Sequence, residues 1–262
     1  MPLKFCANLS FMFQETASLL ERYGLAKQAG FRAVECAFPY DFSTEDVVAA
    51  KKNAGVEQVL INVFVGDVTK GELGFAALPG QEEEFKNSIS LAIKYAKALE
   101  CPRIHIMSGR VEDVTRENAD TYEKNIRYAT SLLEKENIVG LIEPINPYSV
   151  PKYYMNSYEK GLELVKKINS PNLKLMMDLF HLQHLRGNLT HNIEDLLPYV
   201  GHIQIAQVPH RNEPDTNGEI NYQYVFSVLE KNGYNGWIGL EYKPLEATAV
   251  GLKWIRNFGY SL

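Results

Sequence analysis

Cysteine is scarce in this sequence, where Cys6, Cys36 and Cys101 are spread over 262 residues. An odd and unclustered set of cysteines argues against a disulfide framework and is typical of a chain that folds in a reducing compartment. No nucleophile motif surrounds any of the three, so thiol catalysis is not predicted. The N-terminus shows no targeting segment, and the cytoplasm is therefore the expected location.

An excess of positive charge is also missing. The chain carries 27 Lys and Arg residues against 32 Asp and Glu residues, which gives a formal net charge of −5. A basic surface is what draws a protein to nucleic acid or to an anionic membrane, so neither partner is predicted. No apolar run approaches the ~20 residues of a membrane-spanning helix, so we expect no membrane segment.

Several common catalytic motifs are absent as well. Asn8-Leu9-Ser10 stands after the first apolar run, where a dinucleotide-binding fold would begin its glycine-rich turn. There is no Walker-type phosphate loop and no serine nucleophile elbow. The six histidines do not show the spacing of zinc ligands. These absences exclude the corresponding nucleotide, hydrolase and zinc sites from the prediction.

The sequence does contain a regular alternation of short apolar runs and longer amphipathic ones. The apolar runs cover residues 3–9, 32–38, 58–64, 103–107, 139–144, 173–179, 200–206 and 236–242. Such near-continuous runs are typical of parallel strands covered by helices. Repeated eight times in a chain of 262 residues, the alternation predicts a single (β/α)8 TIM barrel over residues 1–262. A doubly wound open sheet is the alternative, which the missing glycine-rich turn disfavours.

The amphipathic segments show helical periodicity. In residues 82–100 the apolar side chains that fall on one face are Phe85, Ile89, Ala92, Ile93 and Ala96. Asn156-Ser157 and Asn192 are predicted N-caps of two later helices, because side chains of these types accept hydrogen bonds from the free N–H groups of a first turn.

Polar side chains stand where four consecutive predicted strands end. They are Glu143, Asp178, Gln204 and Glu241. The chemistry of a TIM barrel takes place at the carboxyl ends of its strands, so these side chains are expected to converge. Three carboxylates that face one another repel unless a cation lies between them. Oxygen ligands favour Mg²⁺ or Mn²⁺, which predicts a divalent metal site, while separate salt bridges or helix caps are the alternative.

Further candidates lie near the same end of the barrel. His105 ends the fourth predicted strand and His181 follows Asp178 by three residues. His210 and Arg211 belong to the connection after the seventh strand, and Asn62 lies near the end of the third. We expect these residues to contact substrate. For His105 and His181, buried histidines satisfied by hydrogen bonds are the alternative.

The connection after the third predicted strand, residues 66–80, is long and rich in glycine. A long loop at the catalytic face of a barrel can act as a lid. The alternative is a surface excursion without a catalytic role.

Longer motifs carry a resemblance to a known family. They are LIEPIN (141–146), MMDLFH (176–181), GHIQIAQVPHR (201–211), GEINY (218–222) and GLEYKP (239–244), together with residues 66–80 and 101–110. In combination they resemble the hydroxypyruvate isomerase family, whose members are xylose isomerase-like TIM barrels. The resemblance covers nearly the whole chain and implies the reversible conversion of hydroxypyruvate to 2-hydroxy-3-oxopropanoate (tartronate semialdehyde).

The resemblance also implies roles for individual residues. Glu143 and Glu241 match the acid/base pair of the family, and Glu143, Asp178, Gln204 and Glu241 match its metal ligands. In the wider superfamily, histidine commonly fills the place that Gln204 holds here. Moving a carbonyl between adjacent carbons needs a proton removed from one carbon and returned to the next, which two carboxylates can do. A metal stabilises the enediolate between these steps, so no organic cofactor is expected.

The resemblance is less complete around the substrate. His181 matches a substrate-contacting histidine of related sugar epimerases, and either His210 or Arg211 matches a basic residue that orients the substrate. Many relatives read Gly-Glu-Arg-Gly where this chain has Gly71-Glu72-Leu73-Gly74, so an arginine that could hold a carboxylate is missing there.

Other functions compatible with the same residues stay open at this point. A ketose 3-epimerase or an inosose dehydratase could use the same metal and the same two glutamates. A DNA-repair nuclease of the superfamily would need several zinc ions and a basic groove, which six histidines and a net charge of −5 disfavour. A barrel that binds metal or sugar without catalysis is a further alternative. The expected partner is a small hydroxy-keto acid, and a homodimer is the expected assembly.

Overall fold

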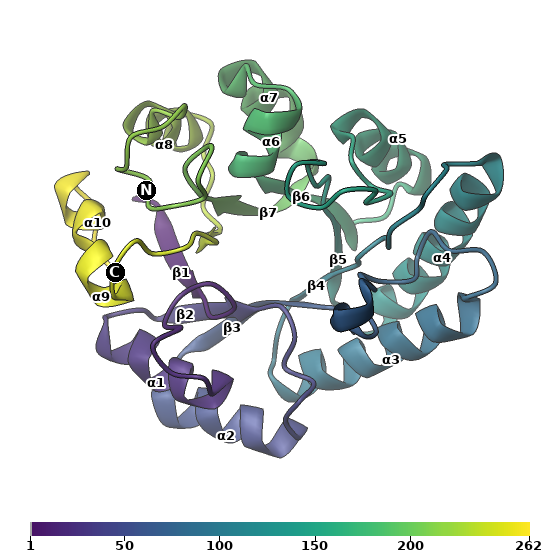
Figure 1. Cartoon of the computed structure of the whole chain (residues 1–262), viewed down its shortest axis with the longest axis horizontal. Helices are drawn as coiled ribbons and strands as arrows, with labels where there is room; N and C mark the ends of the chain where they lie inside the picture. The colour runs from purple at the N-terminus through teal and green to yellow at the C-terminus, as the bar shows by residue number, and fades with distance from the viewer. Residues whose placement is uncertain (1) are drawn as a thin grey trace.

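The computed structural model describes residues 2–262 and shows eight parallel strands closed into a barrel, each hydrogen-bonded to the next along the chain (Figure 1). The strands are β1 (Lys4–Asn8), β2 (Ala33–Cys36), β3 (Glu57–Asn62), β4 (Arg103–His105), β5 (Val139–Ile142), β6 (Leu173–Asp178), β7 (Val200–Ile205) and β8 (Trp237–Leu240). Pairing between β1 and β8 closes the barrel. The predicted TIM barrel is confirmed, and the open-sheet alternative is wrong.

Helices form an outer ring around the strands, in chain order (Figure 1). They are α1 (Leu19–Gln28), α2 (Thr44–Ala54), α3 (Glu82–Ala98), α4 (Arg116–Lys135), α5 (Tyr158–Ile168), α6 (Leu179–Leu185), α7 (Leu189–Leu196), α8 (Tyr222–Lys231), α9 (Thr248–Gly251) and α10 (Lys253–Asn257), with 3-10 turns at Val68–Lys70 and Leu197–Tyr199. Within residues 2–262, none of these helices combines the length and the apolar character needed to cross a membrane.

The helix α3 buries the face that its sequence predicts, with Phe85, Ile89, Ala92 and Ala96 inside and Ile93 only partly buried. The predicted cap of α5 is confirmed, since Ser157 accepts a hydrogen bond from the backbone N–H of Lys160. The predicted cap at Asn192 is wrong. That residue lies within α7, and its side chain donates to the carbonyls of Gly187 and Asn188.

The barrel interior consists of an apolar layer with a polar layer above it. A separate apolar cluster includes Cys6, Ala33, Leu60, Leu141 and Met176. Two residues further along the same strands stand Asn8, Glu35, Asn62, Glu143 and Asp178. Alternate residues of a strand point to the same side, so both sets line the interior, and the second set lies nearer the carboxyl ends. The change from apolar to polar therefore marks where the packed core ends and a site can begin.

The loop after β3 is only partly exposed. Val68–Lys70 is exposed, whereas residues 74–77 are buried. Two side chains of α4 hold the buried part, because Asn118 donates to the carbonyl of Ala77 and Asn125 to that of Ala76, each at 2.9 Å. Residues 74–77 of the loop are thus part of the folded core, and only the first half of the loop fits the alternative of a surface excursion.

Candidate active site

The four predicted side chains gather at the carboxyl end of the barrel. Glu143 and Glu241 directly follow β5 and β8, while Asp178 ends β6 and Gln204 lies one residue before the end of β7. Asp178 and Gln204 are neighbours in the β6–β7 pairing. Asp178 is 0% exposed, Gln204 1% and Glu143 4%, and the side chain of Glu241 is 15% exposed. A carboxylate that is buried in this way loses its contact with water, so a positive charge or hydrogen-bond donors must stabilise its negative charge.

Arg211 supplies part of that compensation. Its Nη2 lies 3.4 Å from Oδ2 of Asp178 and donates a short hydrogen bond to Oε2 of Glu241. The guanidinium is held between the rings of Phe11 and Phe180, 4.7 Å from each centroid, as expected for cation–π contacts. Arg211 thus places one positive charge among the carboxylates of β6 and β8.

Glu143 has no comparable partner among residues 2–262. Its Oε1 makes no hydrogen bond, and its Oε2 lies 3.6 Å from Nδ1 of His105. Burial lowers the pKa of His105 to about 3, so the imidazole is neutral at physiological pH and does not neutralise the carboxylate. In the part of the chain that the structure describes, neither ring nitrogen of His105 has a hydrogen-bond partner. Within the described residues, Glu143 therefore has no cationic side chain in direct contact with it.

The three carboxyl groups resist being ionised together. Burial raises the pKa of Glu143 well above its usual value, and the charges of Glu241 and Asp178 raise it further. Burial also raises the pKa of Glu241 to about 8 and that of Asp178 above its usual value, although Arg211 opposes both shifts. Raised pKa values of clustered acids at a barrel mouth are typical of functional sites.

The oxygen atoms of this cluster fit a divalent cation. Oε1 of Glu143 and Oε1 of Gln204 are buried acceptors, and neither has a hydrogen-bond partner within residues 2–262. A carboxylate oxygen of Glu143 and one of Asp178 lie within 4.8 Å of each other, so both side chains can reach one ion. Carboxylate and amide oxygens are ligands that Mg²⁺ and Mn²⁺ prefer. The side chains present thus fit a divalent cation.

His181 faces the same cluster as a hydrogen-bond donor. Its Nδ1 accepts the backbone N–H of Asn146 at 3.2 Å, and the side-chain amide of Asn146 lies 2.6 Å from the same nitrogen. Burial lowers the pKa of His181 well below its usual value, so the ring is neutral and its proton is on Nε2. Nε2 lies 3.5 Å from Asp178 Oδ2 and 3.8 Å from Glu143 Oε1. A protonated nitrogen cannot bind a metal, so in this geometry Nε2 is available only as a hydrogen-bond donor.

The remaining predicted residues are placed differently. Asn62 ends β3, is partly buried, and points its amide at the sulfur of Met107, 3.6 Å away. His210 is exposed, and within residues 2–262 no hydrogen bond or ion pair joins it to the carboxylates, whereas its neighbour Arg211 reaches two of them. Of the two basic residues considered for this loop, only Arg211 lies in the cluster.

Four buried residues near the site were not predicted, namely Asn8, Glu35, Asn146 and His202. The signal for Glu35 was present, because it is a carboxylate in the middle of the apolar run 32–38 rather than at its end. A prediction drawn from strand ends alone misses such a residue. Asn146 lies in the LIEPIN motif, but its role depends on the distant His181, which only the fold brings close.

A surface cavity of about 620 Å³ opens beside the site. Phe11 and Lys243 are among its lining residues, and Phe11 also stacks on Arg211. Phe11 therefore joins the wall of this cavity to the guanidinium that contacts the carboxylates.

Comparison with known families agrees with the fold. The family described as xylose isomerase-like TIM barrel matches residues 23–258, most of the chain. A hydroxypyruvate isomerase of Escherichia coli (strain K12) is 41% identical over 97% of this chain and 98% of its own. A Danio rerio protein that bears that name provisionally is 47% identical over 98% of this chain and 96% of its own.

Two further relatives differ in name. A Cupriavidus necator protein named 2-oxo-tetronate isomerase is 40% identical over 97% of this chain and 98% of its own. A solved structure from Brucella melitensis, named AP endonuclease, family 2, has a TM-score of 0.94 and 44% identity, covering 98% of this chain and 99% of its own. The chain therefore belongs to the xylose isomerase-like TIM barrel family and, within it, groups with hydroxypyruvate isomerase.

Proposed function

We propose that this chain is an isomerase that interconverts hydroxypyruvate and 2-hydroxy-3-oxopropanoate. The observation that carries the proposal is the cluster of three carboxylates at the ends of β5, β6 and β8, where, within residues 2–262, Glu143 Oε1 and the neighbouring Gln204 Oε1 have no hydrogen-bond partner. Acceptor oxygens of this kind are available to bind a cation or a substrate. The names of the near-full-length relatives support the choice of hydroxypyruvate.

Glu143, Asp178, Gln204 and Glu241 would hold a divalent cation, Mg²⁺ or Mn²⁺. When bound, the ion supplies Lewis-acid stabilisation for the negative charge that develops on the substrate oxygens. The oxygen-only ligand set and the partnerless buried acceptors support this assignment. No organic cofactor is needed for the reaction.

Glu143 and Glu241 would carry the proton transfers. One of them, as the carboxylate, takes a proton from C3 of hydroxypyruvate, and the electron pair of the C–H bond forms the enediolate between C2 and C3. The other, as the acid, delivers a proton to C2, while the proton of the C3 hydroxyl group passes to the oxygen on C2. A carbonyl then stands on C3 and a hydroxyl group on C2. A carboxyl group accepts a proton when ionised and donates one when protonated, so the two glutamates suit both roles.

His181 and Arg211 would orient the substrate. His181 presents its Nε2–H toward the carboxylates, where a substrate oxygen could accept it. The Arg211 guanidinium can pair with the substrate carboxylate in two parallel hydrogen bonds. In the protein alone it pairs with Asp178 and Glu241 instead, so a cation that takes over those two carboxylates would free Arg211 for the substrate. A substrate-binding role for Asn62, His105 and His210 stays a prediction.

The experiment is proton NMR of hydroxypyruvate in D₂O with EDTA-treated protein, before and after addition of Mn²⁺ or Mg²⁺. We expect 2-hydroxy-3-oxopropanoate to form only with metal and to carry deuterium at C2. Glu143→Gln and Glu241→Gln should each lower the rate by about 10²–10⁴-fold, the usual contribution of a general acid or base. Glu123→Gln on α4, a surface glutamate paired with Arg127 and Lys167, is the matched control and should keep full activity.

Full activity in one of the two active-site variants would show that the glutamate substituted there does not transfer a proton. Absence of product with every metal tested would remove hydroxypyruvate as the substrate. Product without deuterium would argue for a hydride shift in place of proton transfer with solvent exchange.

A second candidate substrate is 2-oxo-tetronate, because one relative at 40% identity carries that name. The same glutamates could act on it, since it also has a carbonyl group next to a carboxylate. Values of kcat/KM for the two acids measured side by side would decide between them, and a panel of ketoses would test the 3-epimerase alternative.

Cleavage of abasic-site DNA in the presence of Zn²⁺ would test the activity that the name of the Brucella melitensis protein states. A net charge of −5 disfavours that activity here.

A further inference from the structure

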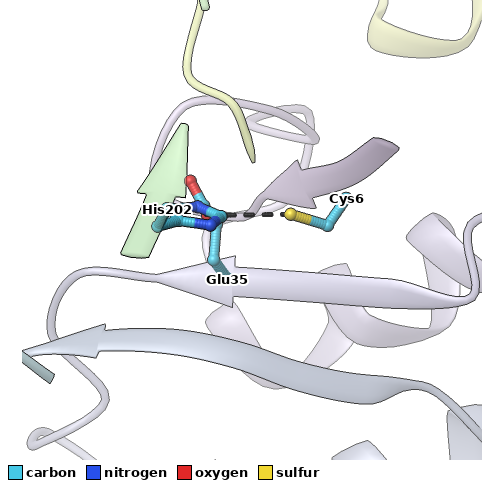
Figure 2. A group of neighbouring side chains, drawn as sticks. All are labelled: Cys6, Glu35 and His202. Carbon is cyan, nitrogen blue, oxygen red and sulfur yellow. Dashed lines mark hydrogen bonds and ion pairs between the residues drawn. The ribbon is translucent and has the colours of Figure 1, made fainter. Parts of the chain in front are cut away.

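Glu35 on β2 is the centre of a buried hydrogen-bond network beneath the site. The residue is 0% exposed and accepts hydrogen bonds from side chains of β1 and β7. Figure 2 shows Cys6 and His202 pointing toward the Glu35 carboxylate from different strands. The reaction proposed above gives Glu35, Cys6 and His202 no role.

The two carboxylate oxygens of Glu35 face different partners. Oε2 is 2.6 Å from Nε2 of His202 and 3.7 Å from the thiol of Cys6, which both lie deeper in the barrel. Oε1 accepts the side-chain amides of Gln204 at 2.7 Å and Asn8 at 2.8 Å. Gln204 and Asn8 stand two residues beyond His202 and Cys6 along their strands, so Oε1 faces the proposed active site.

The contact with Glu35 fixes which way the Gln204 amide points. A carboxylate only accepts hydrogen bonds, so the amide must turn its Nε2 donor toward Glu35 and its oxygen away. The opposite orientation would bring two oxygen acceptors together at the same distance. Oε1 of Gln204 is buried and has no partner within residues 2–262, as expected for an oxygen that is held ready for a cation.

Through Asn8, the same oxygen of Glu35 is also linked to Glu241, which follows β8. The Asn8 amide that it accepts donates as well to Oε1 of Glu241, 3.2 Å away. Gly239 on β8 leaves room for this arrangement, because a Cβ at that position would lie 2.3 Å from Glu35 Oε1. One buried carboxylate is thus joined to two of the four proposed ligands.

We propose that Glu35 is a positioning residue of the metal site, which orients the Gln204 oxygen and, through Asn8, the Glu241 carboxylate toward the cation. The proposal rests on the metal site of the proposed function but not on its substrate. Partners that orient metal ligands typically change metal affinity by 10- to 100-fold when they are removed. The effect belongs to binding of the ion and does not require turnover.

The experiment measures Mn²⁺ binding to metal-free protein by electron paramagnetic resonance, without substrate. We expect one ion per wild-type chain, and affinity about 10- to 100-fold weaker in Glu35→Ala. Glu35→Gln should recover most of the affinity, because one amide oxygen can still accept both Gln204 and Asn8. Cys6→Ala is the matched control, since it removes only a contact to Oε2, and it should bind within about 3-fold of wild type. Circular dichroism establishes that each variant is folded.

Wild-type affinity in folded Glu35→Ala would overturn the proposal while leaving the metal site intact. If that variant does not fold, a crystal structure of the Mn²⁺-loaded wild-type chain provides the test. Gln204 Oε1 bound to the ion, with Nε2 on Glu35, supports the proposal, and any other orientation overturns it. An ion held by Cys6, Glu35 and His202 themselves would also overturn it. Failure of the wild-type chain to bind Mn²⁺ would remove both this proposal and the metal site, whatever the substrate.

Discussion

At the residue scale, the positive charge of one arginine partly balances the carboxylates of the site. Arg211 contacts Asp178 and Glu241, yet burial still keeps the pKa values of both acids raised. A guanidinium and a divalent cation compete for the same carboxylates, because both bind them through charge. If Arg211 also binds the substrate carboxylate, its removal should affect metal and substrate in opposite directions.

We therefore predict that Arg211→Met strengthens Mn²⁺ binding to the substrate-free protein several-fold. The same change should raise KM for hydroxypyruvate by about 10- to 100-fold, the usual range for a lost hydrogen bond to a charged group. Calorimetric titration with Mn²⁺ and steady-state kinetics give the two values. Arg186→Met, which removes a guanidinium that pairs with Glu159 away from the site, is the control. Weaker Mn²⁺ binding in Arg211→Met would mean that the arginine supports the metal site instead of competing with it.

At the element scale, the site depends on how the loop after β3 docks against the end of β4. Gly74 has a φ of 98°, and a Cβ there would lie 2.4 Å from the carbonyl oxygen of Met107. Only glycine allows that approach. Met107 also contacts the amide of Asn62, so the loop and the rim of the barrel share this residue.

We predict that Gly74→Ala destabilises the protein by at least about 2 kcal/mol, because it adds a clash with the backbone to the strain of positive φ. Gly80→Ala is the matched control. Gly80 also has positive φ, but a Cβ there would meet nothing within 4 Å, so only the strain of about 1 kcal/mol is expected. Thermal unfolding of both variants measures the difference, at ~2–4 °C per kcal/mol. Equal losses in the two variants would show that the loop does not depend on the close approach.

At the scale of the whole molecule, buried carboxyl groups make stability depend on pH. Glu143, Asp178 and Glu241 have raised pKa values in the folded, metal-free chain, so the folded state binds more protons than the unfolded state once pH exceeds the usual carboxyl range. The contribution of each acid is complete at low pH and is lost as pH rises through its pKa in the folded chain, which for Glu241 is about 8. His105 and His181 have the opposite effect on stability, because their pKa values are lowered in the folded chain. Their effect is limited to pH values below about 6.5, the usual pKa of histidine.

We accordingly predict that the free energy of unfolding of the metal-free protein falls by a few kcal/mol between pH 6.5 and 8.5. Urea unfolding in EDTA across this range measures it. Glu241→Gln should flatten the curve, because it removes one of the titrating groups. Saturating Mn²⁺ should restore stability at the upper end, since metal binding favours the ionised carboxylates. A flat curve for the metal-free wild-type chain would contradict the proposed coupling of the three acids.

The sequence by itself determined the barrel and most of the carboxylate cluster. Eight apolar runs with helical segments between them specify parallel strands inside a ring of helices. Because the site of a barrel forms at the carboxyl ends of its strands, Glu143, Asp178, Gln204 and Glu241 could be placed together from strand order alone. This prediction needed local periodicity and one rule of topology, and no knowledge of which side chains touch.

Only the tertiary structure decided how these groups are satisfied. Three features depend on contacts between residues that are distant in sequence. Arg211, and not His210, reaches the carboxylates. Asn146 sets the tautomer of His181, and Glu35 orients Gln204. Glu35 and Gln204 are 169 positions apart. Hydrogen bonds of this kind are fixed by angles and distances of a few ångströms, which the closed barrel defines and which no periodicity in the chain records.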